Sequence, residues 1–390
     1  MTWLCKRQPF WALRRFDGDL VQSAAAAAWA LDGSIFLPVL RPMILDSQRS
    51  TSISAAATAL QRGELLGLPT ETVYGLAADA CNDAAVAKIF AAKGRPASHP
   101  LIVHVASAQS VLHFASHVPD FAQKLMDAFW PGPLTLILPR RPEVSAVAAG
   151  GQNSVGLRCP SHPTAQAVLQ SAEALGVLGV AAPSANVFGR VSPTTAAHVA
   201  GEFGDGLLIL DGGACGVGIE STIVDCTRAS PVLLRPGVLT PQQLSDACGM
   251  RVITPNAPDA DAPRASGTLA SHYAPTAKVQ LMTAVDLQNA ILAYEIASAT
   301  NSAELKAEGA AAGKVAVWSR CTVQLPATHA ALFQVQPMPP LANDCAHQLF
   351  AQLRSFDDQG VAHIWVEAPP PTPEWDGVRD RLTRAATPTR

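Results

Sequence analysis

Apolar and polar positions recur along most of the chain at two spacings, one typical of helices and one of strands. Residues 51–62 are rich in helix formers, and a helix capped by Asn82 or Asp83 is expected to run to about residue 92. The short apolar segments 64–68 and 101–105 have the length and composition of buried strands. Helices and strands therefore follow one another from about residue 50 onward.

The same alternation continues through the first 250 residues. Helices are expected near residues 110–115, 121–129, 164–174 and 195–203, and strands at 134–138, 155–157, 177–182, 207–210, 221–225 and 232–234. Such a dense mixture of the two element types predicts an α/β domain over residues 49–250, with an open sheet covered by helices.

A break in this pattern separates a second, smaller domain. Residues 254–264 contain three prolines and little apolar surface, so residues 251–276 are expected to form a linker. Strands are then expected near 279–282, 315–318 and 363–366, and helices near 287–297, 345–353 and 378–385. This order predicts a small Rossmann-like parallel sheet over residues 277–390. Because this domain lacks a G-x-G-x-x-G turn, no dinucleotide is assigned to it.

Residues 1–48 differ in composition from the rest. They combine an early basic cluster with an alanine run at 24–28 and an apolar stretch at 35–40. Aspartates interrupt the segment and its apolar runs are too short to span a bilayer, so a targeting role is the weaker interpretation. We expect a disordered extension, or an upstream start codon with the working start at Met43.

The balance of charge and the use of cysteine narrow the classes of function. The chain has 28 basic and 31 acidic side chains and a net charge of -3, whereas proteins that coat nucleic acid usually show a basic excess. Contact with tRNA or other RNA is therefore expected to be weak and local. The eight cysteines form no C-x-x-C pair and no zinc-spaced cluster, which is typical of reduced thiols in a cytoplasmic protein without a metal site of its own.

Candidate chemistry lies in polar loops that follow expected strands. The loop 69–75 carries two threonine hydroxyls, a carboxylate and a phenol, and the ends of strands are where open α/β sheets bind ligands; an ordinary polar turn is the alternative. Lys93 and Arg95 flank a glycine at the C-terminus of an expected helix. They can act as partners of the helix dipole, or they can clamp a phosphate.

Later loops add more isolated cations and hydroxyls. Arg158 ends a strand among apolar neighbours and requires an anion there, either a substrate carboxylate or an internal ion-pair partner. Segments 183–186 and 189–194 follow another strand and lead into a helix N-terminus, which suits a phosphate, although simple capping by Thr194 explains it equally. With the glycine loop 212–218 and Arg235, these features favour a site for a polyanion and a small zwitterion.

These segments resemble the YrdC-type threonylcarbamoyl-AMP synthases in their longer, two-domain form. The resemblance runs from about residue 50 to the C-terminus. It is carried by blocks at 69–75, 93–96, 99–101, 154–160, 182–186, 220–225 and 234–237, by the linker segment 271–275 and by the last helix at 379–386. It implies a YrdC-like fold, a twisted open mixed sheet with helices around a positively lined central cavity, and a linker that returns over this cavity. His99 stands where many members have asparagine, and residues 267–270 depart from the family's Gly-Met-Lys pattern.

Position in these motifs implies a role for individual residues. Lys93 and Arg95 are expected to carry catalysis. The L-threonine contacts implied by the resemblance are Thr72, His104, Arg158, Ser184 and Ser221. The implied ATP contacts are Lys93, Arg95, His99, Ser154, Asn186, Thr194, Arg235 and Tyr273.

The resemblance also implies a reaction. L-threonine, bicarbonate or CO2, and ATP would give threonylcarbamoyl-AMP and pyrophosphate, for modification of the tRNA adenosine next to the anticodon. Mg²⁺ is expected on the ATP phosphates, downstream tRNA threonylcarbamoyl-transferase proteins are expected as partners, and no membrane is expected to take part. Two alternatives stay open: an RNA-binding or ribosome-associated protein, and a carbamoyl-transfer module that uses carbamoyl phosphate.

Overall fold

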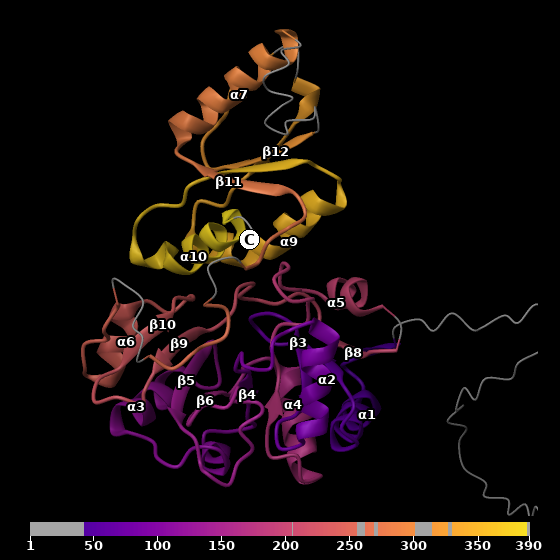
Figure 1. Cartoon of the computed structure of the whole chain (residues 1–390), viewed down its shortest axis with the longest axis vertical. Helices are drawn as coiled ribbons and strands as arrows, with labels where there is room; N and C mark the ends of the chain where they lie inside the picture. The colour runs from indigo at the N-terminus through magenta and orange to yellow at the C-terminus, as the bar shows by residue number, and fades with distance from the viewer. Residues whose placement is uncertain are drawn as a thin grey trace, which may run out of the picture. The chain divides into compact units, whose positions relative to one another are not determined.

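The first domain of the computed structural model is built on a mixed sheet (Figure 1). The structure describes residues 43–204, 206–255, 262–268, 272–300, 314–326 and 330–387, so the expected extension up to residue 42 lies outside the described residues. The strands are β1 (Met43–Asp46), β2 (Leu66–Leu68), β3 (Gly75–Asp79), β4 (Ile102–His104), β5 (Leu134–Pro139), β6 (Ser154–Arg158), β7 (Val180–Ala181), β8 (Leu208–Asp211), β9 (Thr222–Asp225) and β10 (Val232–Arg235). Their order across the sheet is β1-β8-β2-β3-β7-β4-β6-β5-β9-β10.

This sheet begins earlier than the sequence indicated. β1 pairs in parallel with β8, placing Met43 opposite Leu208 and Asp46 opposite Asp211. Residues 43–46 therefore belong to the sheet, although the domain was expected to start at residue 49. A strand of four residues shows too few positions to reveal a period. β3 was also missed, because it is short and follows the polar loop 69–75 almost directly.

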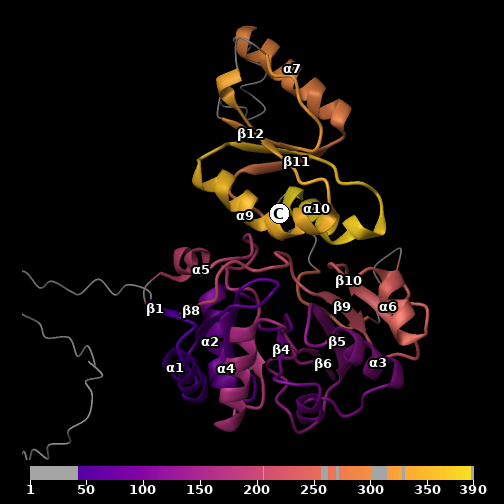
Figure 2. The ribbon, with the colours of Figure 1, turned by 180° about the vertical axis from the view of Figure 1, so that it is seen from behind.

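Helices cover both faces of the sheet. On one face, α1 (Ser50–Gln61) and α4 (Pro163–Ala174) lie side by side, and on the other α2 (Asp83–Lys93) and α3 (Asp120–Phe129) join a separate apolar cluster (Figures 1 and 2). Successive residues of β3 point to opposite faces of the sheet. Ala77 packs with α1 and α4, whereas Leu76 and Ala78 pack with α2. Two further helices are α5 (Ala196–Phe203) and α6 (Pro241–Cys248). The helix expected near residues 110–115 is instead a short 3-10 helix, η1 (Gln109–His113).

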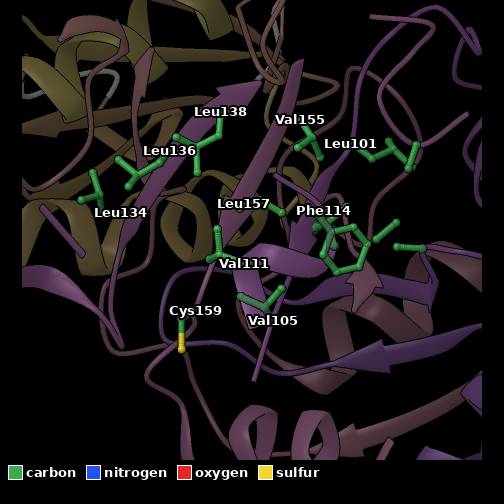
Figure 3. Close-up of a cluster of buried hydrophobic side chains, with 14 of the residues drawn as sticks. Leu101, Val105, Val111, Phe114, Leu134, Leu136, Leu138, Val155, Leu157 and Cys159 are labelled. Atoms are coloured by element: carbon green, nitrogen blue, oxygen red, sulfur yellow. The ribbon is translucent and has the colours of Figure 1, made fainter. Parts of the chain in front are cut away.

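The larger cluster fixes the central strands that carry site residues. Figure 3 shows Leu134, Leu136 and Leu138 of β5 in this cluster with Phe114. A Cβ atom at Gly179 would lie 2.6 Å from the Phe114 ring, so the chain just before β7 can approach this ring only as glycine. Burial of each large apolar side chain contributes about 1.5–3 kcal/mol relative to exposure.

The second domain has a parallel sheet in the order β11-β14-β12-β13, with strands β11 (Lys278–Met282), β12 (Val315–Ser319), β13 (Phe333–Pro337) and β14 (His363–Glu367). Its helices are α7 (Ala284–Thr300), α9 (Ala342–Asp358) and α10 (Asp376–Ala386), with 3-10 turns η2 (Ala330–Leu332) and η3 (Pro373–Trp375). Val315 and Val317 of β12 join the α7 cluster, whereas Ala316 and Trp318 join the cluster that contains α9 and α10. A parallel sheet covered on both faces confirms the α/β layout expected for this part.

Two smaller features complete the fold. The edge strand β13 was not expected from the sequence, and its terminal Pro337 suits an edge because proline cannot donate to a neighbouring strand. Within the described ranges, none of the helices combines the length and the apolar content that crossing a bilayer requires.

Candidate active site

A cavity lies where the loops at several strand ends meet the linker, with about 520 Å³ of space between its lining atoms when the adjoining open solvent is included. It lies against the ends of β6 and β10, the loops after β2 and β7, the segment before β9, and linker residues 266–267 and 272–273. Of the residues expected from the sequence, its walls contain Thr72, Arg95, His104, Arg158, Ser184, Ser221, Arg235 and Tyr273.

The loop after β2 is shaped by its own hydroxyl groups. The Thr70 hydroxyl accepts hydrogen bonds from the backbone N–H groups of Thr72 and Val73, each at 3.2 Å, and donates to the Val73 carbonyl at 2.6 Å. This local turn buries the Thr72 side chain completely and places its hydroxyl 2.9 Å from that of Thr70. Thr72 is therefore presented to the cavity by a rigid turn.

Arg158, at the end of β6, is held on every nitrogen of its guanidinium group. Nη2 donates to a Glu71 carboxylate oxygen at 2.6 Å, Nη1 donates to the Thr72 hydroxyl at 2.7 Å, and Nε donates to the Gly132 carbonyl at 3.3 Å. The sequence left open an internal ion pair or a substrate carboxylate as the anion for this arginine. The ion pair is present, and each terminal nitrogen still has one N–H for a further acceptor.

Arg235 fixes the segment that carries Ser221. Its Nη2 donates to the Ser221 carbonyl at 2.8 Å and to the Ser221 hydroxyl at 3.1 Å, and Nε donates to the same carbonyl. The Ser221 hydroxyl also lies 2.7 Å from the Thr135 hydroxyl on β5. Because both side chains are buried, Ser221 and Arg235 form a preorganised pair in the cavity wall.

Arg95 reaches the cavity from the turn after α2. Its Nη2 donates to the Pro100 carbonyl at 2.9 Å and to the Ser266 hydroxyl at 3.3 Å, while the guanidinium lies 5.5 Å from the centre of the Phe188 ring. Burial, and then the charge of Arg235, lower the pKa of Arg95 to about 10, so it stays charged at neutral pH. Arg235 also donates to Ser266, at its carbonyl, so one linker residue is held by both cations.

Four buried polar atoms of cavity-lining residues have no hydrogen-bond partner among the described residues: Nε of Arg95, Nδ1 of His104, Nδ1 of His272 and the hydroxyl of Tyr273. Burial and the neighbouring Arg158 lower the pKa of His104 to about 3, so its ring is neutral. Burial and Glu220 raise the pKa of the Tyr273 hydroxyl to about 12. Tyr273 also has a φ of 62°, a conformation that costs about 1–3 kcal/mol in a non-glycine residue. Buried polar groups normally find a partner, so these atoms are candidates for ligand binding.

Lys93 and Asn186 lie beside the cavity and are not among the described residues that line it. The Lys93 ammonium donates to the carbonyls of Ser184 and Asn186, at 2.6 Å for the first, and so ties α2 to the segment after β7. Burial, then repulsion from Arg95, lowers the pKa of Lys93 to about 7. The Asn186 amide donates to the carbonyls of Val187 and Arg190 and closes its own loop.

Three other expected ATP contacts lie in neighbouring places. His99 and Ser154 each line an adjoining cavity, and Arg264 of the linker lines both of these cavities. Thr194 lies before α5, but Thr195 is the residue that caps this helix, by accepting a hydrogen bond from the His198 N–H. The simple capping role considered for Thr194 is therefore wrong, because the helix begins one residue later.

Several cavity residues were not expected to have a role. Glu220, Ser266, Gly267 and His272 all line the cavity. Glu220 stands next to Ser221 in the sequence, so a carboxylate directly beside an expected contact was the available signal. His272 lies in the linker segment 271–275 that carries the family resemblance, whereas Ser266 and Gly267 gave no signal, because polar and glycine-rich composition is typical of any linker.

Two family models match the chain in succession. The first, described as Telomere recombination, matches residues 58–237, and the second, described as the C-terminal domain of threonylcarbamoyl-AMP synthase, matches residues 239–387. The threonylcarbamoyl-AMP synthase of Bacillus subtilis is 37% identical over 346 residues, which cover 87% of this chain and 94% of that protein. The chain belongs to the threonylcarbamoyl-AMP synthase family.

Further relatives agree with this family. The threonylcarbamoyl-AMP synthase of Pyrococcus abyssi is 44% identical over 230 residues, 58% of this chain and 66% of that protein. A crystal structure of P. abyssi Sua5 complexed with L-threonine has a TM-score of 0.74 and 34% identity, and the match covers 89% of this chain and 97% of that one. Membership of the threonylcarbamoyl-AMP synthase family makes this chain an enzyme of the nucleotidyltransferase type, and the likeness to Sua5 confirms the expected fold.

Proposed function

We propose that the cavity between the strand ends and the linker is where this chain condenses L-threonine, bicarbonate or CO2, and ATP into threonylcarbamoyl-AMP and pyrophosphate. The observation that carries the proposal is the convergence of Arg95, Arg158 and Arg235 with buried hydroxyl groups on one cavity in a member of this family. The relative complexed with L-threonine supports the choice of amino acid.

L-threonine binds between the loop after β2 and the end of β6. The two spare N–H groups of Arg158 receive its carboxylate, and the neutral His104 ring and the Thr72 and Ser221 hydroxyls surround it. Ala182 and Val73 lie in the same wall and can pack against its methyl group. Ser184 is placed here by Lys93, which holds the Ser184 carbonyl.

ATP binds on the side of Arg95, Arg235 and the linker. Its phosphates replace Ser266 as the hydrogen-bond acceptor of the Arg95 and Arg235 guanidinium groups. The protonated Tyr273 hydroxyl also donates to the phosphates. His99, Ser154, Asn186 and Thr194 remain proposed contacts at the edge of this site.

Catalysis rests on positioning and electrostatics. The threonine amine attacks the carbon of CO2 and loses a proton to give a carbamate, and a carbamate oxygen then attacks the α-phosphorus as the bond to pyrophosphate breaks. Both steps gather negative charge, which Arg95, Arg158 and Arg235 stabilise from fixed positions in a mostly buried site. Lys93 is proposed to add to this field when it is protonated.

Mg²⁺ fits this site as part of the nucleotide. No group of three or more potential metal-binding side chains occurs among the residues that the structure describes. The two carboxylates near the cavity already accept hydrogen bonds from other residues. Glu71 accepts from Arg158 and Ser161, and Glu220 accepts from Ser192 and Arg381. A metal ion would therefore be held by the ATP phosphates and would neutralise part of their charge.

The product is a labile mixed anhydride and requires an acceptor. We propose that downstream tRNA threonylcarbamoyl-transferase proteins receive it in the cytoplasm, for the tRNA adenosine next to the anticodon, with no more than weak contact between this chain and tRNA. The near-neutral charge of the chain supports that last point.

Pyrophosphate release by the full chain tests the proposed reaction. Release should require ATP, L-threonine and bicarbonate together, and mass spectrometry should identify threonylcarbamoyl-AMP. Serine lacks one methyl group and should support the reaction about 10-fold less well. Release that ignores threonine, or a product without the threonyl group, would refute the assignment.

A further inference from the structure

One arginine of the last helix contacts the catalytic domain beside its cavity. Arg381 on α10 is fully buried, and its Nε donates to a Glu220 carboxylate oxygen at 2.9 Å. Its Nη1 donates to the Pro236 carbonyl at 2.7 Å, and Nη2 donates to the Glu220 carbonyl at 3.2 Å. Its guanidinium also lies 5.4 Å from the centre of the Tyr273 ring. A single side chain of the C-terminal domain thus holds three separate segments.

Each of these segments carries a proposed substrate contact. Glu220 directly precedes Ser221, and Pro236 directly follows Arg235. Tyr273 is itself a cavity residue, held in a left-handed conformation and packed against the His272 ring at 4.2 Å between centroids. Displacing Arg381 would therefore disturb both sides of the cavity at once.

The ion pair is suited to fixing geometry more than to adding stability. Glu220 is bound on its other oxygen by the Ser192 hydroxyl at 2.5 Å, and Arg381 is also paired with Asp380 at 3.0 Å. A buried, fully partnered pair of this kind contributes little net free energy of folding, because desolvation offsets the attraction. Its directional hydrogen bonds nevertheless permit only one arrangement of the groups.

The backbone of α10 is fixed equally closely. A Cβ atom at Gly377 would lie 2.6 Å from the Gly237 carbonyl oxygen, so the start of the helix lies directly on the segment that follows Arg235. Ile219, Tyr273 and Val378 share one buried apolar cluster around this contact. Arg381 therefore projects from a backbone that has little freedom to shift.

We propose that Arg381 is a positioning residue for the adenylation reaction, through which the C-terminal domain holds Ser221, Arg235 and Tyr273 in their working geometry. This inference rests on the proposed placement of those three residues at the substrates. The second domain would then take a direct part in activity, although none of the described residues of that domain lines the cavity.

The test compares Arg381 with a chemically matched arginine of the same domain. Arg320 also pairs with a glutamate, Glu367, and also lies over an aromatic ring, that of Trp375, but these partners all belong to the second domain. Arg381→Gln, Arg381→Lys and Arg320→Gln in the full chain should be assayed for pyrophosphate release, with kcat and KM measured separately for ATP and L-threonine. Thermal unfolding of each variant sets a temperature at which all are folded.

Arg381→Gln should lower kcat/KM on the order of 100-fold, as expected when reacting groups are misplaced by about 1 Å. Arg381→Lys keeps the charge opposite Glu220 but cannot reach all its partners, so it should recover part of the loss. For Arg320→Gln, kcat/KM should stay within about twofold of the wild-type value. This should hold even if its melting temperature falls as far as that of Arg381→Gln.

Wild-type kcat/KM in folded Arg381→Gln, or an equal loss in Arg320→Gln, would overturn the inference. If Arg381→Gln fails to fold, wild-type kinetics in folded Arg381→Lys would overturn it in the same way. A wild-type chain that releases no pyrophosphate would overturn the proposed function as well, whereas an active wild type with unaffected Arg381 variants would overturn the positioning role alone.

Discussion

Arg158 and Glu71 form an ion pair in the cavity wall, with 2.6 Å between nitrogen and oxygen. The other oxygen of Glu71 accepts from the Ser161 N–H at 3.0 Å, so the carboxylate is fixed from two directions. Glu71 thereby sets the plane of the guanidinium and leaves one N–H on each terminal nitrogen for a substrate. The ion pair and the substrate contact, which the sequence presented as alternatives, are thus compatible.

Replacing Arg158 should weaken the binding of threonine selectively. Arg158→Ala removes charge-assisted hydrogen bonds worth about 1.5–3 kcal/mol, so KM for L-threonine should rise about 10- to 100-fold with little change in KM for ATP. Steady-state pyrophosphate assays with each substrate varied in turn measure this. Arg141→Ala is the control, because Arg141 is exposed and lies outside the cavity wall as described. An equal rise in both KM values would count against a carboxylate contact.

Arg95 should matter for the rate more than for substrate binding. Arg95→Ala removes a fixed cation next to the proposed phosphates, so kcat should fall about 100- to 1000-fold, which corresponds to about 2.7–4 kcal/mol. Arg95→Lys keeps a charge but cannot contact Pro100 and a phosphate at once, and should recover only part of the activity. Near-native kcat in folded Arg95→Ala would remove this residue from the phosphate site.

The strand ends were the part of the site most accessible to prediction. Polar residues at or after the ends of apolar strands, such as Thr72 and Arg158, lie together in the structure because β2 and β6 belong to one sheet and the two residues line one cavity. Short elements were less accessible, since β1 and β3 have too few residues to show a period.

Pairings between distant residues could not be predicted from one sequence. Arg158 lies 87 positions from Glu71, and Arg381 lies 161 positions from Glu220. The sequence indicated that Arg158 requires an anion but not which one, and only the folded chain shows that the members of each pair are buried together. For the same reason Lys93 was expected among the catalytic residues, whereas its ammonium is satisfied by two backbone carbonyls, and its catalytic role stays a prediction.

The linker leaves no room for a side chain at Gly267. Gly267 has a φ of 74°, and a Cβ atom there would lie 2.4 Å from the Tyr273 hydroxyl and 2.8 Å from Nη1 of Arg235. Gly267→Ala should therefore displace Tyr273 and lower kcat/KM for ATP about 10-fold or more, by about 1.4 kcal/mol of transition-state stabilisation. Gly201→Ala is the matched control, since nothing lies within 4 Å of its Cβ position. Equal kinetics in the two folded variants would show that the linker does not depend on this contact.

Glu220 should give the protein a stability that depends on pH. Burial alone would raise the pKa of its carboxyl group, but Arg381 and Arg235 hold it below the ordinary value of 4.5. A carboxyl whose pKa is lower in the folded state stabilises the fold above its unfolded pKa, and this contribution is lost as the pH falls through the folded value. Glu220→Gln should therefore be less stable than the wild type at pH 7, by up to about 3–5 kcal/mol, because it leaves Arg381 without its main counter-charge.

Urea unfolding of both proteins between pH 7 and pH 3.5 measures this difference. The gap in unfolding free energy should narrow as the pH falls below about 4.5, where the Glu220 carboxyl of the unfolded wild-type chain begins to take up a proton while that of the folded chain stays ionised. Glu64→Gln is the control, since Glu64 is exposed and its replacement should change stability by no more than about 0.5 kcal/mol. A gap for Glu220→Gln that stayed constant over the whole range would show that Arg381 does not favour the ionised carboxylate, because only a difference in proton binding between the folded and unfolded states produces a slope with pH.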